Sequence, residues 1–340
     1  MKNNGVKMET IAELAGVSVM TVSRALSGAN NCNPATRKKI ENIAKQLGYF
    51  PNLLGRSLLQ NKLNTVGIII PNIIHSFFPR VVNAIEEKLA NHGINTFLCC
   101  SRDDTKIESE KVRMLLGYRV AGIIMFPSLR SKESEISART IIDNGCPLVI
   151  VDRLIPKISA DSVGWKSEQG MDEMVAHLLS RGCKNLVYCA GDIDEWKNRK
   201  RTLGFFSALK RRDVKPAGEI YCEPSAIAVE KEIKNLLSRN NNIDAICCAT
   251  DICADLVLYA LKRMKIKVPE DIAITGFGAV INNHNSKLTI TTARQDEALM
   301  GKTSAEIIIE RILSKNKPPF KPLKKILLPV KVEYGQSSMH

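Results

Sequence analysis

Residues 12–28 read AELAGVSVMTVSRALSG, and this stretch decides the fold of the N-terminal part of the chain. Just before and within it, apolar residues at positions 8, 11, 12, 14 and 15 recur at helical spacing, which predicts a helix over Met8–Ala15. Gly16 suits the left-handed turn that ends a helix, and Ser18 suits the cap of a second helix over Val19–Leu26. Two short helices joined in this way predict a helix-turn-helix, whose second helix enters the major groove of DNA.

The residues that follow predict a third helix and a positively charged module. Asn33-Pro34 is a cap followed by a proline at the first helical position, and the helix it opens runs to Leu47, before Gly48. Up to Lys62 the chain has nine basic residues against three acidic ones, a surplus of six within a whole-chain net charge of +14. Such a surplus is typical of a surface that binds nucleic acid.

From Thr65 onward apolar runs alternate with amphipathic helical patterns. The runs predict buried strands at 66–71, 95–100, 122–127, 147–152, 185–191, 244–249 and 271–278. Helical patterns lie between them, for example at 79–91, 168–181, 201–212 and 252–264. This alternation predicts an α/β fold of two doubly wound parallel sheets, with a ligand cleft at the carboxyl ends of the strands.

Several functional classes are not supported by the sequence. No run of eighteen apolar residues occurs and the N-terminus, MKNNGVKMET, has no apolar signal stretch, so we expect a cytoplasmic protein without a membrane segment. The ten cysteines form no C-x-x-C or zinc-spaced cluster, and the neighbours Cys99-Cys100 and Cys247-Cys248 should point to opposite faces of their strands as free thiols. Nucleotide-binding and catalytic motifs are also absent, so we expect no metal, no cofactor and no enzyme activity.

At this point the chain resembles the lactose-repressor (LacI/GalR) family of transcriptional regulators. The resemblance rests on residues 12–28, on TRKKIENIAKQLGYFPN (36–52) and GRSL (55–58), and on core stretches such as IIPNIIHSFFPRVVNAIEEKLANHGI (69–94) and ATDICADLVLYALKRMKIKVPEDIAITGFG (249–278). It implies a three-helix headpiece (1–50), a hinge helix and linker (51–64), and a core like periplasmic sugar-binding proteins. The implied core lobes are 65–163 with 292–319 and 164–291 with 320–340.

The resemblance also implies which residues contact DNA. Val19, Met20 and Arg24 would read base edges, and Leu58 of the hinge would insert into the minor groove. The headpiece departs from the family at Lys7, where the usual threonine cap of the first helix is missing. Capping or solvation is the alternative role for these phosphate-contacting residues, and for Ser18 and Asn33 capping and phosphate contact can coexist. The implied set is Ser18, Thr21, Ser23, Asn33, Thr36, Tyr49, Asn52 and Arg56.

A second set of residues would bind a small effector between the lobes. Phe77 and Phe78 would stack on the ligand or instead pack into the core, and Trp165 has the same two alternatives. Arg201 matches the family arginine that clamps the effector, with a solvated side chain as the alternative. The full implied set is Phe77, Phe78, Ser101, Asp103, Ser128, Asp152, Trp165, Lys166, Lys197, Arg201, Thr250 and Asp251.

Departures from the family pattern concern the charge of that effector. Gly276-Phe277-Gly278-Ala279 stands where Gly-Phe-Asp-Asp is usual, and Lys166-Ser167 replaces an Asp-Asn. Acceptors are lost and cations are gained, which favours an anionic effector, a sugar acid as in gluconate-type repressors or a sugar phosphate. If both Lys166 and Lys197 face solvent instead, the effector is a neutral sugar.

Together these features predict a repressor of carbohydrate-utilisation genes that binds a palindromic operator as a homodimer and is released by its effector. Within the family, an activator or a corepressor-dependent repressor is the alternative. A transport protein would need an export signal, and an enzyme would need a catalytic constellation. No heptad run follows the core, so a tetramerising coiled coil is not expected.

Overall fold

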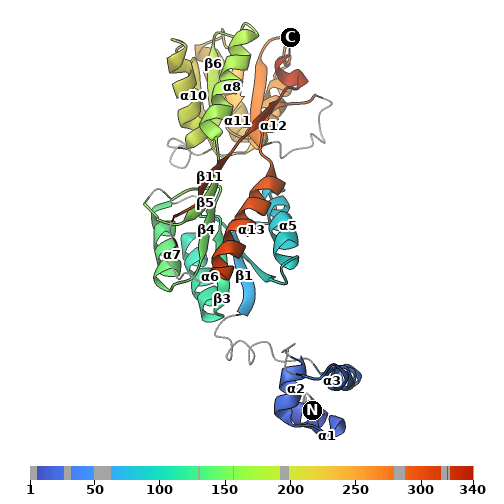
Figure 1. Ribbon diagram of the computed structural model, residues 1–340. Helices are drawn as coiled ribbons and strands as arrows, with labels where there is room; N and C mark the ends of the chain where they lie inside the picture. Colours follow the sequence, from blue (N-terminus) through green and yellow to red (C-terminus); the bar gives the residue numbers. More distant parts are fainter. Residues whose placement is uncertain are drawn as a thin grey trace. The chain divides into compact units, whose positions relative to one another are not determined.

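The computed structural model describes residues 6–26, 32–49, 63–128, 131–155, 157–191, 199–278, 288–314, 320 and 322–339. It divides into two compact units, residues 1–63 and residues 64–340. Figure 1 shows the small helical unit and the larger unit of sheets and helices. No described helix is long and apolar enough to cross a membrane.

The first unit holds three helices, α1 (Met8–Ala15), α2 (Val19–Leu26) and α3 (Pro34–Gln46), which confirms the predicted helix-turn-helix. Gly16 has a φ of 67°, the left-handed conformation that the turn needs. Ser18 Oγ accepts a hydrogen bond from Thr21 N at 3.2 Å, and Asn33 Oδ1 accepts one from Ala35 N at 2.9 Å, so both predicted caps form. Lys7, as expected, makes no side-chain cap bond. The helices bury a small core: Ile11, Ala12, Ala15, Val22, Ala25, Ile40 and Ala44.

The second unit contains two six-stranded sheets, which confirms the predicted α/β class. The first sheet has the order β11-β5-β4-β3-β1-β2. Its strands are β1 (Leu63–Ile70), β2 (Asn95–Cys100), β3 (Val120–Met125), β4 (Leu148–Val151), β5 (Asp161–Trp165) and β11 (Lys325–Leu328). Its helices are α5 (Phe77–Ala90), α6 (Thr105–Gly117), α7 (Ser131–Asp143) and α13 (Glu297–Leu313). We call this part lobe one.

The second sheet has the order β12-β10-β9-β8-β6-β7, and β12 alone among its described strands runs antiparallel to its neighbour. Its strands are β6 (Leu186–Ala190), β7 (Gly218–Tyr221), β8 (Ala245–Cys248), β9 (Ala273–Gly278), β10 (Thr291–Arg294) and β12 (Lys331–Glu333). Helices α8 (Ser167–Ser180), α10 (Lys200–Arg211), α11 (Ala226–Arg239) and α12 (Asp251–Arg263) flank it, and a short 3-10 helix, η1 (Gln336–Ser338), follows β12. We call this part lobe two.

Each sheet is covered on both faces, which explains why the strands are continuous apolar runs. In lobe one, Ile68 packs in the cluster under α5 and α13, while its neighbour Ile69 packs in the cluster under α6 and α7. In lobe two, Cys247 and Cys248 likewise belong to clusters on opposite faces, as predicted. All ten cysteines are free thiols.

The strand pairing corrects the predicted lobe boundaries. β10 pairs with β9 (Thr291↔Thr275), so residues 292–294 belong to lobe two and not to lobe one. β11 pairs with β5 (Lys325↔Ser162), so the chain is still in lobe one at Leu328 and crosses only before Lys331, not near 320. The first crossing follows Trp165 rather than 163. The proline-rich stretch near 320 marks a break after α13, but only pairing decides which sheet the next strand joins.

Candidate functional site

The exposed face of α2 carries the residues predicted to read bases. Val22 and Ala25 are buried against α1 and α3, and the opposite side of the helix presents Val19, Met20 and Arg24. Met20 is 63% exposed and Val19 is 38% exposed, so both apolar side chains are accessible on the surface of the helix. An apolar pair beside an arginine one turn later can contact thymine methyl groups and a guanine edge.

The predicted phosphate contacts divide into several local environments. Ser18 also lies 2.9 Å from the Thr21 hydroxyl (Oγ to Oγ1), so the two form one polar group at the start of α2. Tyr49 packs against the headpiece core, and burial together with nearby Glu9 raises the pKa of its phenol. Ser23 and Thr36 are half-buried and Asn33 is exposed. Asn52, Arg56 and Leu58, with most of the hinge, lie outside the described residues.

Arg201 is the centre of the predicted effector residues of lobe two. It stands in the first turn of α10, donates from Nη1 to the carbonyl of Ala249 at 2.8 Å and from Nη2 to Oε1 of Gln295 at 3.1 Å. Its guanidinium lies 4.1 Å from the centre of the Phe277 ring. Burial lowers the pKa of Arg201, and the nearby carboxylate of Asp152 opposes that shift most strongly.

Thr250 and Asp251 are at the same edge of the sheet, but their oxygens are engaged by the protein. Thr250 Oγ1 caps α12 by accepting from Cys253 N at 3.1 Å. Asp251 is buried and its Oδ1 accepts from the Thr292 hydroxyl at 2.7 Å. A side chain at Gly276 would put its Cβ 2.1 Å from that same oxygen, so only glycine fits there. The edge of lobe two therefore offers few unengaged acceptors.

Lobe one has its own arginine at the strand ends. Arg153, which follows β4, forms an ion pair with Asp103 and donates to the carbonyl of Pro127 at 3.1 Å. Its guanidinium also lies 6.0 Å from the centre of the Phe78 ring. Asp152 and Asp103 both have left-handed backbone conformations, with φ of 66° and 56°. The loops after β2 and β3 thus both contact Arg153, which belongs to the loop after β4.

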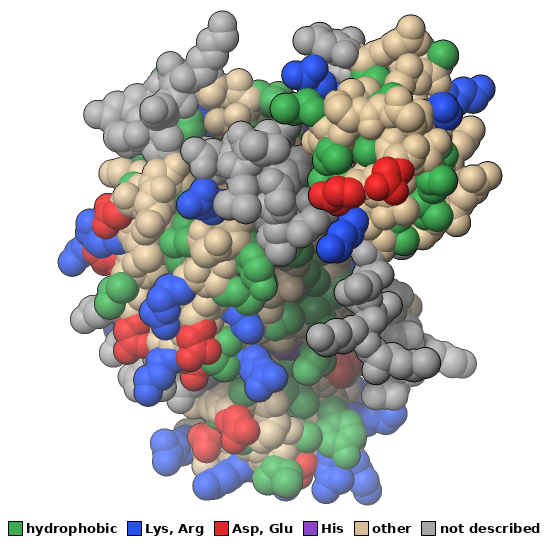
Figure 2. Space-filling model, turned by 90° about the horizontal axis from the view of Figure 1, so that it is seen from below, with side chains coloured by type: hydrophobic (Ala, Val, Ile, Leu, Met, Phe, Trp, Pro, Cys, Tyr) green, Lys and Arg blue, Asp and Glu red, His purple; other side chains and the backbone are tan. Residues whose placement is uncertain are grey.

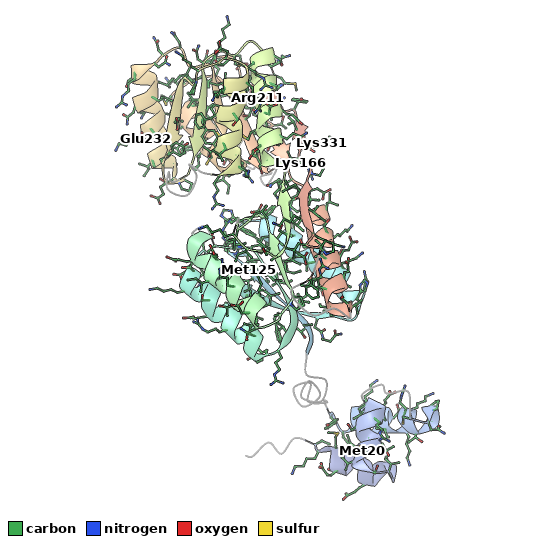
Figure 3. The ribbon with its side chains drawn as sticks, turned by 60° about the vertical axis from the view of Figure 1, so that its left-hand side comes forward. Met20, Met125, Lys166, Arg211, Glu232 and Lys331 are labelled. Carbon is green, nitrogen blue, oxygen red and sulfur yellow. The ribbon has the colours of Figure 1, made fainter. Side chains whose placement is uncertain are left out.

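The other predicted effector residues of lobe one are mostly packed inside. Phe77 and Phe78 are buried, and Phe78 meets Phe126 edge to face at 5.7 Å, which favours the core-packing alternative for both rings. Ser101 and Ser128 are also buried, and Ser128 donates to a buried carboxylate, that of Glu108. Trp165 is 6% exposed. Lys166 is exposed at the first crossing (Figure 3), and Lys197 lies outside the described residues.

Two functional candidates escaped the sequence analysis. Arg153 directly follows the predicted Asp152, and its position at a strand end was an available signal. Gln295 follows the short strand β10, which the hydrophobic pattern did not mark. Its side chain is 2% exposed, and among the described residues its Nε2, like Nε1 of Trp165, has no hydrogen-bond partner. Both are buried donors that need an acceptor.

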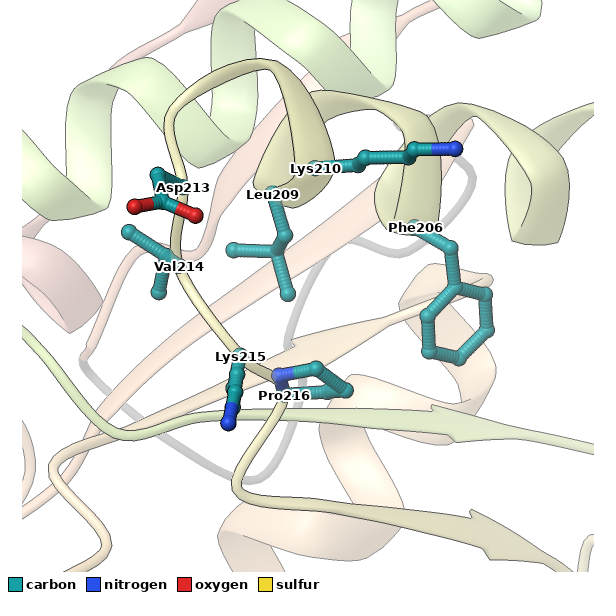
Figure 4. Close-up of a pocket in the computed structure, with 7 residues that line it drawn as sticks. All are labelled: Phe206, Leu209, Lys210, Asp213, Val214, Lys215 and Pro216. Atoms are coloured by element: carbon teal, nitrogen blue, oxygen red, sulfur yellow. The ribbon is translucent and has the colours of Figure 1, made fainter.

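Two surface features of the described residues lie apart from the predicted effector residues. Basic side chains are spread over the face seen in Figure 2 and interspersed with acidic ones, so they form no single patch there. A hollow of about 220 Å³ lies where α10 turns toward β7, away from the predicted residues (Figure 4). It is lined by Phe206, Leu209, Lys210, Asp213, Val214, Lys215 and Pro216.

Comparison with known proteins identifies both units. Residues 7–52 match the model described as bacterial regulatory proteins, lacI family, and residues 175–338 match a periplasmic binding protein-like domain. The chain is 31% identical over 313 residues to the probable HTH-type transcriptional regulator EndR of Paenibacillus polymyxa, covering 90% of each protein. It is 28% identical over 294 residues to the regulator DegA of Bacillus subtilis, covering 86% of this chain and 87% of that one.

Solved structures share the fold over nearly the whole chain. The lac repressor dimer bound to operator and the anti-inducer ONPF matches with a TM-score of 0.86 and 23% identity, over 99% of this chain and 100% of that one. The complex of the transcriptional regulator CelR with cellobiose matches with a TM-score of 0.71 and 22% identity, over 98% and 99% of the two chains.

Proposed function

Because the chain belongs to the LacI family of bacterial transcriptional regulators, we propose that it represses carbohydrate-utilisation genes by binding a palindromic operator as a homodimer. Its relatives regulate transcription, in agreement with the expectation that it is not an enzyme. The observation that carries the proposal is the exposed face of α2, with Val19, Met20 and Arg24 presented opposite a buried face. A regulator that reads the chromosome acts in the cytoplasm.

The hydrogen-bond inventory at the strand ends supports an anionic effector. Gln295 Nε2 and Trp165 Nε1 are buried donors without a partner among the described residues, and Arg201 presents a guanidinium beside Gln295. Two of the three predicted carboxylates are engaged within their own lobe, Asp103 by Arg153 and Asp251 by Thr292, and the third, Asp152, lies near Arg201. The hydroxyls of any sugar both donate and accept, and a carboxylate or phosphate group adds oxygens that only accept. A sugar acid or sugar phosphate therefore fits this inventory better than a neutral sugar.

The edge of lobe one supports the homodimer. β2 is one of the two edge strands of the first sheet, and it exposes Phe97 (39%) and Leu98 (48%). Beside it, α6 and the residue after it expose Met114 (39%) and Tyr118 (46%), and the Tyr118 and Phe97 rings are 5.7 Å apart. An exposed edge strand with an apolar patch is normally covered. We assign these exposed apolar side chains, which lie on both sides of the edge strand and which we call the β2 face, to the contact with a second copy.

Two measurements on the full-length protein test the proposal. DNA selected from random duplexes by the protein should contain a palindrome, and fluorescence anisotropy should show Arg24→Ala weakening that binding about 10- to 100-fold. If the wild-type protein selects no particular sequence from the random duplexes, the operator assignment is wrong.

Calorimetry then tests the effector, using gluconate, glucose 6-phosphate and glucose as probes. Binding of either anion and not of glucose supports the anionic class, whereas binding of glucose alone overturns it. Adding the bound probe to the anisotropy assay gives the direction of regulation: operator affinity falls for induction and rises for corepression.

A further inference from the structure

Helix α6 lies between the effector edge of lobe one and the β2 face. At its beginning, Asp103 immediately precedes the N-cap Asp104 and pairs with Arg153. At its end, Met114 and Tyr118 are part of the β2 face. Thirteen residues of helix span about 20 Å, so this single element reaches both places.

Glu108, in the first turn of α6, is the residue that fixes the helix to the effector edge. The residue is fully buried, and its Oε2 accepts from Ser128 N at 2.8 Å and from Ser128 Oγ at 3.0 Å. The same oxygen accepts from the Ser134 hydroxyl of α7 at 3.1 Å. All three donors reach Oε2 and come from two other segments, whereas Oε1 is buried without a hydrogen-bond partner among the described residues. Glu108 therefore joins α6 to the loop after β3 and to α7.

The loop after β3 is held from its other side by the arginine of the effector edge. Arg153 donates to the carbonyl of Pro127, directly before Ser128. Phe126 packs against Phe78 in the same loop region. Arg153 and Glu108 thus bind consecutive residues of one short loop, so a displacement of Arg153 reaches α6 through a single residue.

The polar contacts between α6 and α7 continue beyond Glu108. Thr105 donates to the carboxylate of Glu133, and the Ser109 and Ser137 hydroxyls lie 3.2 Å apart. With the contact of Glu108 to Ser134, these pairs make a hydrogen-bonded seam along the first turns of α6. The two helices are therefore held together where the loop after β3 meets them.

We propose that Glu108 is a positioning residue through which α6 transmits the state of the effector edge to the β2 face. The inference rests on the proposed function for the identity of both surfaces. Glu108 itself is buried behind Ser128 and contacts neither a ligand nor a second copy in this assignment. Weakening its contacts should therefore alter both ends of α6, the one at the loop after β3 and the one in the β2 face.

Hydrogen exchange on the full-length protein tests this coupling without any ligand. Glu108→Gln replaces a charged acceptor by a neutral one of the same shape, so amide exchange at Phe126–Ser128 should become about tenfold faster. If α6 transmits the change, exchange at Met114–Tyr118 should rise at least about threefold, and the dimer dissociation constant should shift by a similar factor. Glu110→Gln, an exposed carboxylate on the same helix, is the matched control and should change none of these.

The outcomes separate the coupling from the proposed dimer. Faster exchange confined to residues near Ser128, with Met114–Tyr118 as in the wild type, would overturn the coupling. A wild-type protein that stays monomeric would instead count against the dimer, and the exchange result would still decide the role of Glu108. If Glu108→Gln does not fold, Ser128→Ala serves as the second variant, because it removes the hydroxyl donor and keeps the backbone bond. It should give smaller changes of the same sign at both ends of α6.

Discussion

Arg201 shows how one side chain is prepared for a ligand. Its contacts with Ala249 O, Gln295 Oε1 and the Phe277 ring fix the guanidinium plane before any effector arrives. Because the side chain is held by its own lobe, little conformational entropy is lost when an anion binds. Gln295 shares in this arrangement, since its oxygen is taken by Arg201 and its amide nitrogen is left to donate.

Replacing Arg201 should remove most of the affinity for an anionic effector. For Arg201→Met we expect a loss of about 2–4 kcal/mol in binding free energy, because a charge-assisted donor to the ligand disappears. Operator affinity without effector should stay as in the wild type. Calorimetry with the anion identified above measures the loss, and Lys200→Met, an exposed neighbour paired with Glu168, is the control. Equal losses in both variants would contradict the role given to Arg201.

Position 276 must be glycine because a side chain there would collide with Asp251, which accepts a buried hydrogen bond from Thr292. Gly276→Ala would place a methyl group against Asp251 Oδ1, and lobe two should lose about 2–4 kcal/mol of stability because the buried bond from Thr292 is displaced. Urea denaturation measures this loss. Gly117→Ala, at a helical position with open space around it, should leave the stability unchanged or slightly raise it.

At the scale of elements, the segment after β12 is fixed to lobe two by a chain of hydroxyl groups. The Thr291 hydroxyl donates to Gly335 O at 3.0 Å, so Ser338 must donate in its 2.6 Å contact with Thr291 Oγ1. Ser338 has then no proton left, and His177 Nε2 must be the donor in its 2.7 Å contact with Ser338 Oγ. These hydroxyl contacts therefore require that Nε2 of His177 carries a proton in both the neutral and the charged form of the ring.

His177 makes this element sensitive to acid. Burial, and then the charge of Arg181, lower its pKa below the ordinary value of about 6.5. The unfolded chain therefore binds the proton more readily than the folded one, and stability should be constant above about pH 7 and fall as the pH drops below about 6.5.

His177→Gln, which keeps a donor, should remove that part of the pH dependence and cost no more than about 1 kcal/mol at pH 7.5. Denaturation curves between pH 5 and pH 8 give the comparison. An identical pH dependence in both proteins would show that another group is responsible.

At the scale of the whole molecule, the chain crosses three times between two sheets, after Trp165, after Arg294 and after Leu328. These crossings bring residues far apart in sequence to the carboxyl ends of both sheets, among them Arg153 in lobe one and Arg201 in lobe two. The strand order makes β2 an outer strand of lobe one, with β11 at the opposite edge. The assembly is thus expected to depend on β2.

Leu98→Lys should break the homodimer. The exposed leucine lies in the β2 face, and two lysines brought together across a symmetric contact would repel each other, so the dimer dissociation constant should rise at least about tenfold. Sedimentation velocity measures the change, and operator affinity should fall with it. Ile136→Lys, on α7 and 63% exposed, should leave the dimer intact. A Leu98→Lys protein that remains dimeric would place the contact elsewhere.

Much of the fold followed from local patterns. The caps at Ser18 and Asn33, the turn at Gly16 and the seven apolar runs located the three headpiece helices and most of the central strands, because each depends on residues close together in the chain. Five short strands were missed, β5, β7, β10, β11 and β12, since five residues or fewer carry little periodicity.

The sequence by itself determined the class of the protein, a helix-turn-helix joined to an α/β core, because helix caps and buried strands are written in neighbouring residues. Only the tertiary structure decided the composition of the lobes and of the effector edge. The sheet that β11 joins depends on its pairing with β5, more than 150 residues away, and the engagement of Asp103 by Arg153 and of Gln295 by Arg201 depends on contacts across the fold. Hydrogen bonds between such distant residues have no local signature, so they appear only when the chain is folded.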